Sequence, residues 1–324
     1  MPAVFDSLVH KRGLTPHVAW RVSFIVPYII ITALALGILF LCEDAPTGKW
    51  SDRNKVIEAT SVPASSANSI HTPLSEDKDK KLMDGSLPSE HKQDLERSPV
   101  EPTTKEAYTA EVVVAPTPKE MFHVLISPQT LTLAAQYACS FGGELAINSI
   151  IGSYYLKNFP PLGQTGSGRW AAMFGLLNVV FRPLGGIVGD VIYHYTDSVW
   201  AKKYWICFCG VAMGAFELAI GLANPHHEAT MFGLVAGLAV FMDASNGANF
   251  AVVPHVHPFA NGIVSGIIGA TGNFGGIIFA LIFRFNGAHY DRVIWIIGAI
   301  SVTINLGVSW IQPVPRGQVG GNFK

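Results

Sequence analysis

The sequence predicts an all-α integral membrane protein with about seven membrane-spanning helices. Composition is the first reason: 49% of the 324 residues are hydrophobic and 14% are charged, as in a membrane protein diluted by a polar segment. The second is a series of apolar runs of bilayer length, interrupted once by a long polar stretch. The net charge of −1 leaves no basic surface that would suggest nucleic acid as a partner.

The first apolar run covers residues 20–42 and is long enough to cross a bilayer. Trp20 and Arg21 suit a membrane interface, and Pro27 is tolerated because neighbouring helices can satisfy the carbonyl that it frees. Residues 1–19 have neither the basic start nor the apolar core of a signal peptide. We expect them to form an extracellular loop that follows an earlier helix.

Residues 43–123 are rich in Ser, Pro, Glu, Lys and Thr and poor in apolar side chains. Such a segment cannot bury enough surface to fold, which predicts a disordered cytoplasmic linker. Ser98-Pro99 and its neighbours are candidate sites for a kinase or for recruitment of a ubiquitin ligase. The alternative is a solvated tether without a regulatory partner.

Six further apolar runs predict a six-helix unit over residues 124–312, followed by a cytoplasmic tail at 313–324. The runs cover residues 124–151, 170–192, 204–222, 230–253, 262–283 and 293–311. A long linker after the first span is unusual for a seven-helix receptor but fits a transporter with two six-helix halves. We therefore expect the last helix of a first half and a complete second half. Lys and Arg in the short loops do not decide the orientation, so the composition of the linker assigns it to the cytoplasm.

Arg182 lies near the middle of the run 170–192, eight residues before Asp190 and roughly 12 Å from that end of the helix. A guanidinium at this depth cannot lose its proton and must face a cavity or a counter-charge. Its planar set of donors suits a planar oxyanion such as nitrate or a carboxylate. The alternative is a structural ion pair with one of three mid-span acids, Glu144, Glu217 or Asp243.

Those three acids are also candidates for proton coupling. Buried carboxyl groups hold protons more readily than exposed ones, so any of the three could link transport to a proton gradient. Each could equally be a silent partner within the bundle.

Tyr137 and Phe141 are four residues apart and therefore share a helix face. Aromatic rings in a cavity could sandwich a flat anion, although such pairs are more often part of a core. His255 and His257 lack the further ligands that a metal site needs. We read the four cysteines as packing residues and expect no metal or cofactor.

Residues 261–276 carry glycines every three or four positions, along a broad strip of one helix. The glycines are Gly262, Gly266, Gly269, Gly272, Gly275 and Gly276. In a bilayer such a helix persists, and the strip lets a neighbouring helix or a small ligand approach the backbone closely. Asn273 is the polar exception in the strip and needs a partner at that depth. Ordinary packing between helices is the alternative.

Signatures of enzyme chemistry are missing from the sequence. It contains no Walker motif, no nucleophile elbow and no dinucleotide fingerprint after a strand. We therefore expect a protein that is not an enzyme.

Two stretches resemble a known family. The run NGANFAVVPHVHPFANGIVSGIIGATGNFGG at residues 246–276 resembles the second nitrate signature of the nitrate/nitrite porter family, within the major facilitator superfamily. The run RPLGGIVGD at residues 182–190, with Lys202 and Lys203 after it, resembles the second-half copy of the superfamily's cytoplasmic loop pattern. The first span and the long linker are similar to those of fungal members.

This resemblance implies the C-terminal portion of a transporter of about twelve helices that works by alternating access. It implies Arg182 as the substrate arginine, Asn273 as the signature asparagine, and Tyr137 and Phe141 as lining of the substrate path. The implied activity is high-affinity uptake of nitrate, or nitrite, with protons across the plasma membrane for nitrate assimilation. Because the first-half arginine and signature are absent from this sequence, the alternatives are a nitrate-sensing receptor and a truncated half that does not transport.

Overall fold

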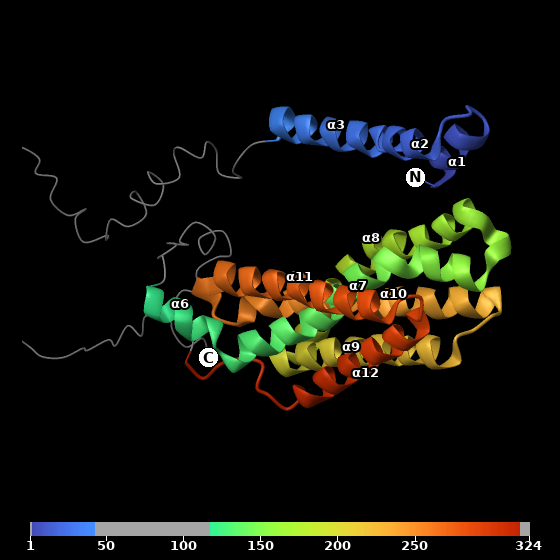
Figure 1. The fold of residues 1–324 in the computed structure, drawn as a ribbon. Coiled ribbons are helices and arrows are strands. Elements are labelled where there is room, and N and C mark those ends of the chain that lie inside the picture. Colours follow the sequence, from blue (N-terminus) through green and yellow to red (C-terminus); the bar gives the residue numbers. More distant parts are fainter. Residues whose placement is uncertain (1, 43–116, 318–324) are drawn as a thin grey trace, which may run out of the picture. The chain divides into compact units, whose positions relative to one another are not determined.

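The computed structural model describes residues 2–42 and 117–317, and every regular element in those two ranges is helical (Figure 1). Ahead of residue 43 lie α1 (Pro2–His10), α2 (Pro16–Ser23) and α3 (Ile25–Leu41). The second range begins with α6 (Pro118–Leu125) and then contains six long helices. These are α7 (Pro128–Asn158), α8 (Gly163–Thr196), α9 (Val199–Ala223), α10 (Glu228–Val252), α11 (Asn261–Asn286) and α12 (Tyr290–Gly307).

The N-terminal residues are more helical than expected. Helix α1 and the start of α2 occupy the range that we assigned to a loop. The first span is broken at Phe24, between α2 and α3, although one continuous helix was expected. Pro27 explains the break, because it has no N–H to donate to the carbonyl of Ser23 and its ring crowds that carbonyl.

Helix α6 begins inside the range that we assigned to the linker. Thr117 and Glu120 form a capping box in which the Glu120 carboxylate accepts hydrogen bonds from Thr117, including its backbone N–H at 2.8 Å. This cap starts the helix at Pro118, where a proline costs no hydrogen bond. Residues 43–116, including the candidate modification site Ser98, lie outside the described residues.

The six long helices form one bundle (Figure 1). Helix α7 packs most closely against α11, α8 against α10, and α9 against both α12 and α10. Three of these helices end at residues that the sequence marks as breaks. Phe159, before the two prolines 160 and 161, follows α7, while Asp197 and Asn224 close α8 and α9 in the left-handed conformation.

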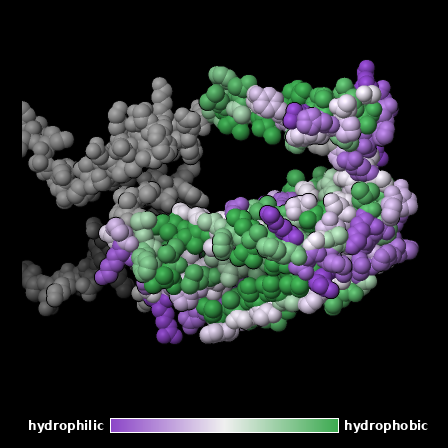
Figure 2. Space-filling model, in the orientation of Figure 1, coloured by the Kyte–Doolittle hydropathy of each residue, from purple (hydrophilic) through white to green (hydrophobic). Residues whose placement is uncertain are grey.

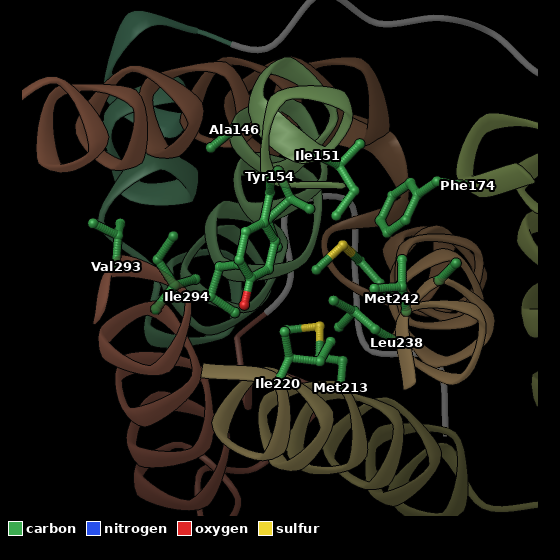
Figure 3. Close-up of a cluster of buried hydrophobic side chains, with 14 of the residues drawn as sticks. Ala146, Ile151, Tyr154, Phe174, Met213, Ile220, Leu238, Met242, Val293 and Ile294 are labelled. Atoms are coloured by element: carbon green, nitrogen blue, oxygen red, sulfur yellow. The ribbon is translucent and has the colours of Figure 1, made fainter. Parts of the chain in front are cut away.

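Two clusters of buried apolar side chains hold the bundle together. The larger contains aromatic, methionine and aliphatic side chains from all six helices, among them Tyr154, Phe174, Met213, Leu238 and Ile294 (Figure 3). The smaller cluster surrounds the other half of α7, where Leu133, Ala134 and Tyr137 meet residues of α9, α10 and α11. Between these clusters α7 carries Ser140, Gly143 and Glu144, which are buried and polar or small.

The surface of the bundle suits a bilayer. Figure 2 shows hydrophobic residues over much of the visible side of the bundle and hydrophilic residues toward its ends. Within the described ranges, five helical segments are long and apolar enough to cross a membrane. They are Pro16–Leu41, Pro160–Thr196, Val199–Ala223, Glu228–His255 and Asn261–Asn286.

Helices α7 and α12 complete the expected set of spans but are less apolar than the other five. Helix α7 contains buried Gln136 and Glu144, and α12 is only 18 residues long and begins with Tyr290, Asp291 and Arg292. Gln136 of α7 donates to Asn305 of α12 at 3.1 Å, so these two helices pair polar side chains that lipid could not satisfy.

Candidate anion-binding site

Arg182 sits in α8, directly before Pro183, and its guanidinium lies against α7. Nη2 donates to Oε2 of Glu144 at 3.2 Å, and Cζ lies 5.3 Å from the centre of the Phe141 ring. The Arg182 side chain is 34% exposed. Of the three acids that could pair with this arginine, the structure therefore selects Glu144.

Tyr137 and Phe141 share a face of α7, as their spacing predicts. Their rings stack with centroids 5.1 Å apart and an angle of 9° between planes. Phe250 of α10 meets Tyr137 edge-on at 5.2 Å. The guanidinium thus lies beside an aromatic wall formed by the stacked Tyr137 and Phe141 rings, with Phe250 of α10 packed edge-on against Tyr137.

Two asparagines complete the polar part of the site. Asn246 of α10 donates from Nδ2 to Glu144 Oε2 at 2.7 Å. Asn178 of α8 donates from Nδ2 to Glu144 Oε1 at 2.5 Å and to Asp243 Oδ1 at 3.1 Å. A single network therefore joins Arg182, Glu144 and Asp243 across three helices.

Glu217 stands apart from that network. It is fully buried in α9 and lies beside Gly143 and Gly298. Neither of its carboxyl oxygens bonds to a residue of the Arg182 network in the described structure, and its polar neighbour is Ser301 of α12. The structure thus separates the three candidate acids into a linked pair, Glu144 and Asp243, and Glu217 outside it.

The glycine strip of α11 divides into two sets. Gly272, Gly275 and Gly276 face α7: a Cβ on Gly272 would lie 2.6 Å from the Tyr137 ring, and one on Gly275 would lie 2.4 Å from the carbonyl oxygen of Ala138. A Cβ on Gly262, Gly266 or Gly269 would meet no atom of the described chain within 4 Å. Only the first set serves the close helix packing within this bundle.

Asn273 is not part of the Arg182 network as the structure has it. Its side chain is exposed, and its Nδ2 donates to the carbonyl of Gly269, one turn earlier in α11, at 2.9 Å. Helix α7 covers the other side of α11, where Gly272 and Gly276 lie. This hydrogen bond within α11 gives the Asn273 amide the polar partner that we expected it to need.

The basic residues of the loop pattern have separate partners. Lys202 Nζ contacts Asp190 Oδ1 at 2.8 Å and His255 Nε2 at 3.0 Å. Lys203 is buried and donates to the carbonyls of Val308 and Ile311, just after α12. Lys202 thus links α9 to Asp190 of α8 and to the turn after α10, while Lys203 links α9 to the segment that follows α12.

His257 lies in the turn between α10 and α11. It is buried, and its ring centroid lies 5.9 Å from that of His123. Burial, together with the charge of His123, lowers the pKa of His257. A neutral imidazole is therefore favoured in this turn.

Asn178, Asn246 and Phe250 are site residues that we did not single out from the sequence. Asn178 is a polar carboxamide one turn before Arg182, within an otherwise apolar run. That position could have identified it as a site residue from the sequence. Asn246 and Phe250 lie within the quoted signature, but their contacts depend on how α10 crosses α7 and α8. No spacing along a single helix contains that information.

The contact of Gly272 with the aromatic wall leads to a prediction. Gly272→Ala should displace the Tyr137 and Phe141 rings and raise the half-saturation concentration of substrate about two- to tenfold, since an aromatic pair contributes about 0.5–1.5 kcal/mol. Concentration-dependent uptake measures the effect. Gly175→Ala in α8 is the matched control, because a Cβ there meets nothing within 4 Å. Equal kinetics for both variants would contradict the role given to the wall.

The arrangement has the chemistry of a site for a small anion. The guanidinium directs one nitrogen to Glu144 and is partly open, so it has donors to offer to an oxyanion. The stacked rings supply a flat apolar surface next to these donors.

Comparisons with known proteins identify transporters. The chain is 41% identical over 311 residues to Elsinochrome transporter 1 of Elsinoe fawcettii, covering 91% of this chain and 60% of that protein. It is 25% identical to High-affinity nitrate transporter 2.3 of Oryza sativa subsp. japonica, covering 90% of this chain and 45% of the relative. It is 28% identical to High affinity nitrate transporter 2.5 of Arabidopsis thaliana, covering 96% and 51%. No family model matches the sequence.

These similarities and the helical bundle together confirm the predicted fold class. The chain is an all-α, multi-pass membrane protein with a partial major facilitator fold. It spans about half the length of the relatives that it matches. Those relatives are named as transporters rather than as enzymes.

Proposed function

We propose that this chain, whose fold class is that of the major facilitator transporters, is the C-terminal portion of a transporter that takes up nitrate or nitrite together with protons. In this proposal Arg182 binds the anion, Tyr137 and Phe141 line its path, and alternating access moves it across the plasma membrane for nitrate assimilation. The observation that carries the proposal is the guanidinium of Arg182, partly open and 5.3 Å from the Phe141 ring. Relatives named as nitrate transporters support the choice of anion.

Asn273 and the open glycines have a different role in this proposal. Gly262, Gly266, Gly269 and Asn273 lie on α11, and no residue that the structure describes packs against the three glycines. Glycines expose backbone that another helix can approach closely in a membrane. We assign this face to contact with a moving part of the complete transporter.

Uptake of labelled nitrate tests the proposal. The full-length product of the gene, expressed in cells that lack nitrate transport, should accumulate nitrate faster when the medium is more acidic than the cytoplasm. Unlabelled nitrite should compete if both anions share the site. Absence of nitrate uptake by correctly inserted protein would refute the proposal. Nitrate binding without uptake would instead indicate a sensor or a non-transporting half.

A second candidate function is transport of an organic compound, which the 41% identity to Elsinochrome transporter 1 favours. The two functions predict different effects of excess nitrate. Excess nitrate should block uptake of labelled nitrate but should not slow export of elsinochrome by a protein dedicated to the organic substrate. Export of elsinochrome by cells that express this protein, without nitrate uptake, would establish the second function.

A further inference from the structure

The site holds two buried carboxyl groups joined by one amide. Asn178 of α8 uses its side-chain nitrogen to donate to Glu144 of α7 at 2.5 Å and to Asp243 of α10 at 3.1 Å. Both acids are buried, with Glu144 7% exposed and Asp243 not exposed. Three helices therefore place two acidic groups within reach of one bridging side chain.

The charges in this cluster do not balance if both acids are ionised. Arg182 supplies one positive charge and pairs with Glu144, so a second ionised carboxyl at Asp243 would leave a net negative charge in a site of low dielectric. An uncompensated buried charge costs several kcal/mol, whereas a protonated acid does not. The pair therefore retains one proton while Arg182 is occupied by Glu144.

The groups that face Glu144 come from three helices. They are Arg182 on α8, Asp243 on α10 and the Tyr137 hydroxyl on α7 itself, while Glu217 of α9 approaches Gly143. Of these, only Arg182 carries a fixed positive charge. Among these neighbours, a change in what Arg182 binds therefore has the strongest effect on whether Glu144 is protonated.

Two buried oxygens of the described cluster accept no hydrogen bond. Oδ2 of Asp243 and Oδ1 of Asn246 lack a hydrogen-bond partner among the described residues. A proton on Asp243 gives the carboxyl a donor of its own. A half-turn of the Asn246 amide would exchange its nitrogen for its oxygen at Glu144 Oε2, where Nδ2 now lies at 2.7 Å. That oxygen could then accept a hydrogen bond from a protonated Glu144 without movement of the backbone.

We propose that Glu144 is a built-in competitor for the transported anion, occupying Arg182 in the empty site and taking up a proton when the anion replaces it. This inference rests on the proposed function. Before binding, the site contains Arg182 with its positive charge, ionised Glu144 and protonated Asp243. After binding, it contains Arg182, the anion, protonated Glu144 and protonated Asp243. The net charge is zero in both states, and one proton from water forms one O–H bond on Glu144 for each anion bound.

Glu217 cannot serve this role from its position. It lies on the side of α7 where Gly143 meets α9, and its carboxyl oxygens have no hydrogen bond to the Arg182 network in the described structure. Glu144 and Glu217 are both acids in the middle of apolar runs, so the sequence alone does not tell which one could fill this role. Their contacts in the structure do.

Transport by the full-length protein in liposomes tests the inference with two measurements. One is accumulation of labelled nitrate driven by a proton gradient, and the other is exchange of nitrate for nitrate at equal pH. Glu144→Gln should lose the gradient-driven accumulation but retain exchange, with a half-saturation concentration about tenfold lower because the competing charge is gone. Glu217→Gln should keep both, and Glu144→Asp, which keeps the carboxyl, should retain coupling.

The outcomes separate this inference from the proposed function. If Glu144→Gln accumulates nitrate in a gradient as the unaltered protein does, the competitor role is overturned while nitrate transport stands. Loss of exchange together with accumulation in Glu144→Gln would also overturn it, since Glu144 would then be needed for binding or folding. If the unaltered protein neither accumulates nor exchanges nitrate, the proposed function itself fails.

Discussion

Arg182→Lys in the full-length protein is expected to raise the half-saturation concentration for nitrate about 10- to 100-fold, since a hydrogen bond to a charged group contributes about 1.5–3 kcal/mol. Lysine keeps the positive charge but replaces a planar fork with a single ammonium, which cannot hold two oxygens of a flat anion at once. The ammonium also has no planar group to offer the Phe141 ring, whose centroid lies 5.3 Å from Cζ of Arg182. Initial rates of labelled nitrate uptake over a range of concentrations measure the change.

Arg169→Lys is the matched control for this experiment. Arg169 belongs to the same helix, α8, and is exposed near its start. The control should leave the half-saturation concentration unchanged, because an exposed lysine and an exposed arginine are hydrated alike. Near-normal kinetics for Arg182→Lys would remove Arg182 from the anion site.

The second large effect is expected at the crossing of α8 and α10. A Cβ on Gly247 would lie 1.8 Å from the carbonyl oxygen of Arg182, and one on Gly185 would lie 2.1 Å from that of Ala244. The two helices therefore touch backbone to backbone at the level of the site. Gly247→Ala must push them apart, which should cost about 1–3 kcal/mol of stability and lower Tm by roughly 5 °C.

Thermal unfolding of the purified protein in detergent measures this effect. Gly233→Ala in the same helix is the control, because a Cβ there meets nothing within 4 Å. Alanine also has a higher helix propensity than glycine. The Tm of this control should be unchanged or slightly higher. A normal Tm for Gly247→Ala would show that the two helices can separate without cost.

Much of the fold could be predicted from the sequence because hydropathy and length dictate membrane helices. The runs that begin near residues 204, 230 and 262 correspond to α9, α10 and α11, within a few residues at each end. The break at Phe24 was missed, although Pro27 provided the signal. The helical turn of α6 was also missed, since its capping box lies in a segment of linker composition.

The partners within the site could not be predicted from the sequence. Glu144, Glu217 and Asp243 are all acids in apolar runs, and nothing in their local sequence tells which one meets Arg182. The choice depends on the rotation of α7 and α8 about their axes, which close glycine contacts between helices help to set. Asn273 illustrates the reverse case: its motif indicated a ligand, but the structure gives its amide a hydrogen bond to its own helix.

The most direct test of the central claim is proton movement evoked by nitrate in liposomes that contain the full-length protein. Addition of nitrate outside should acidify the lumen, as a pH-sensitive dye inside would report, and chloride should have no such effect. Liposomes with Arg182→Lys should need about 10- to 100-fold more nitrate for the same rate. A lumen whose pH does not respond to nitrate, in liposomes with correctly inserted and folded protein, would contradict the account.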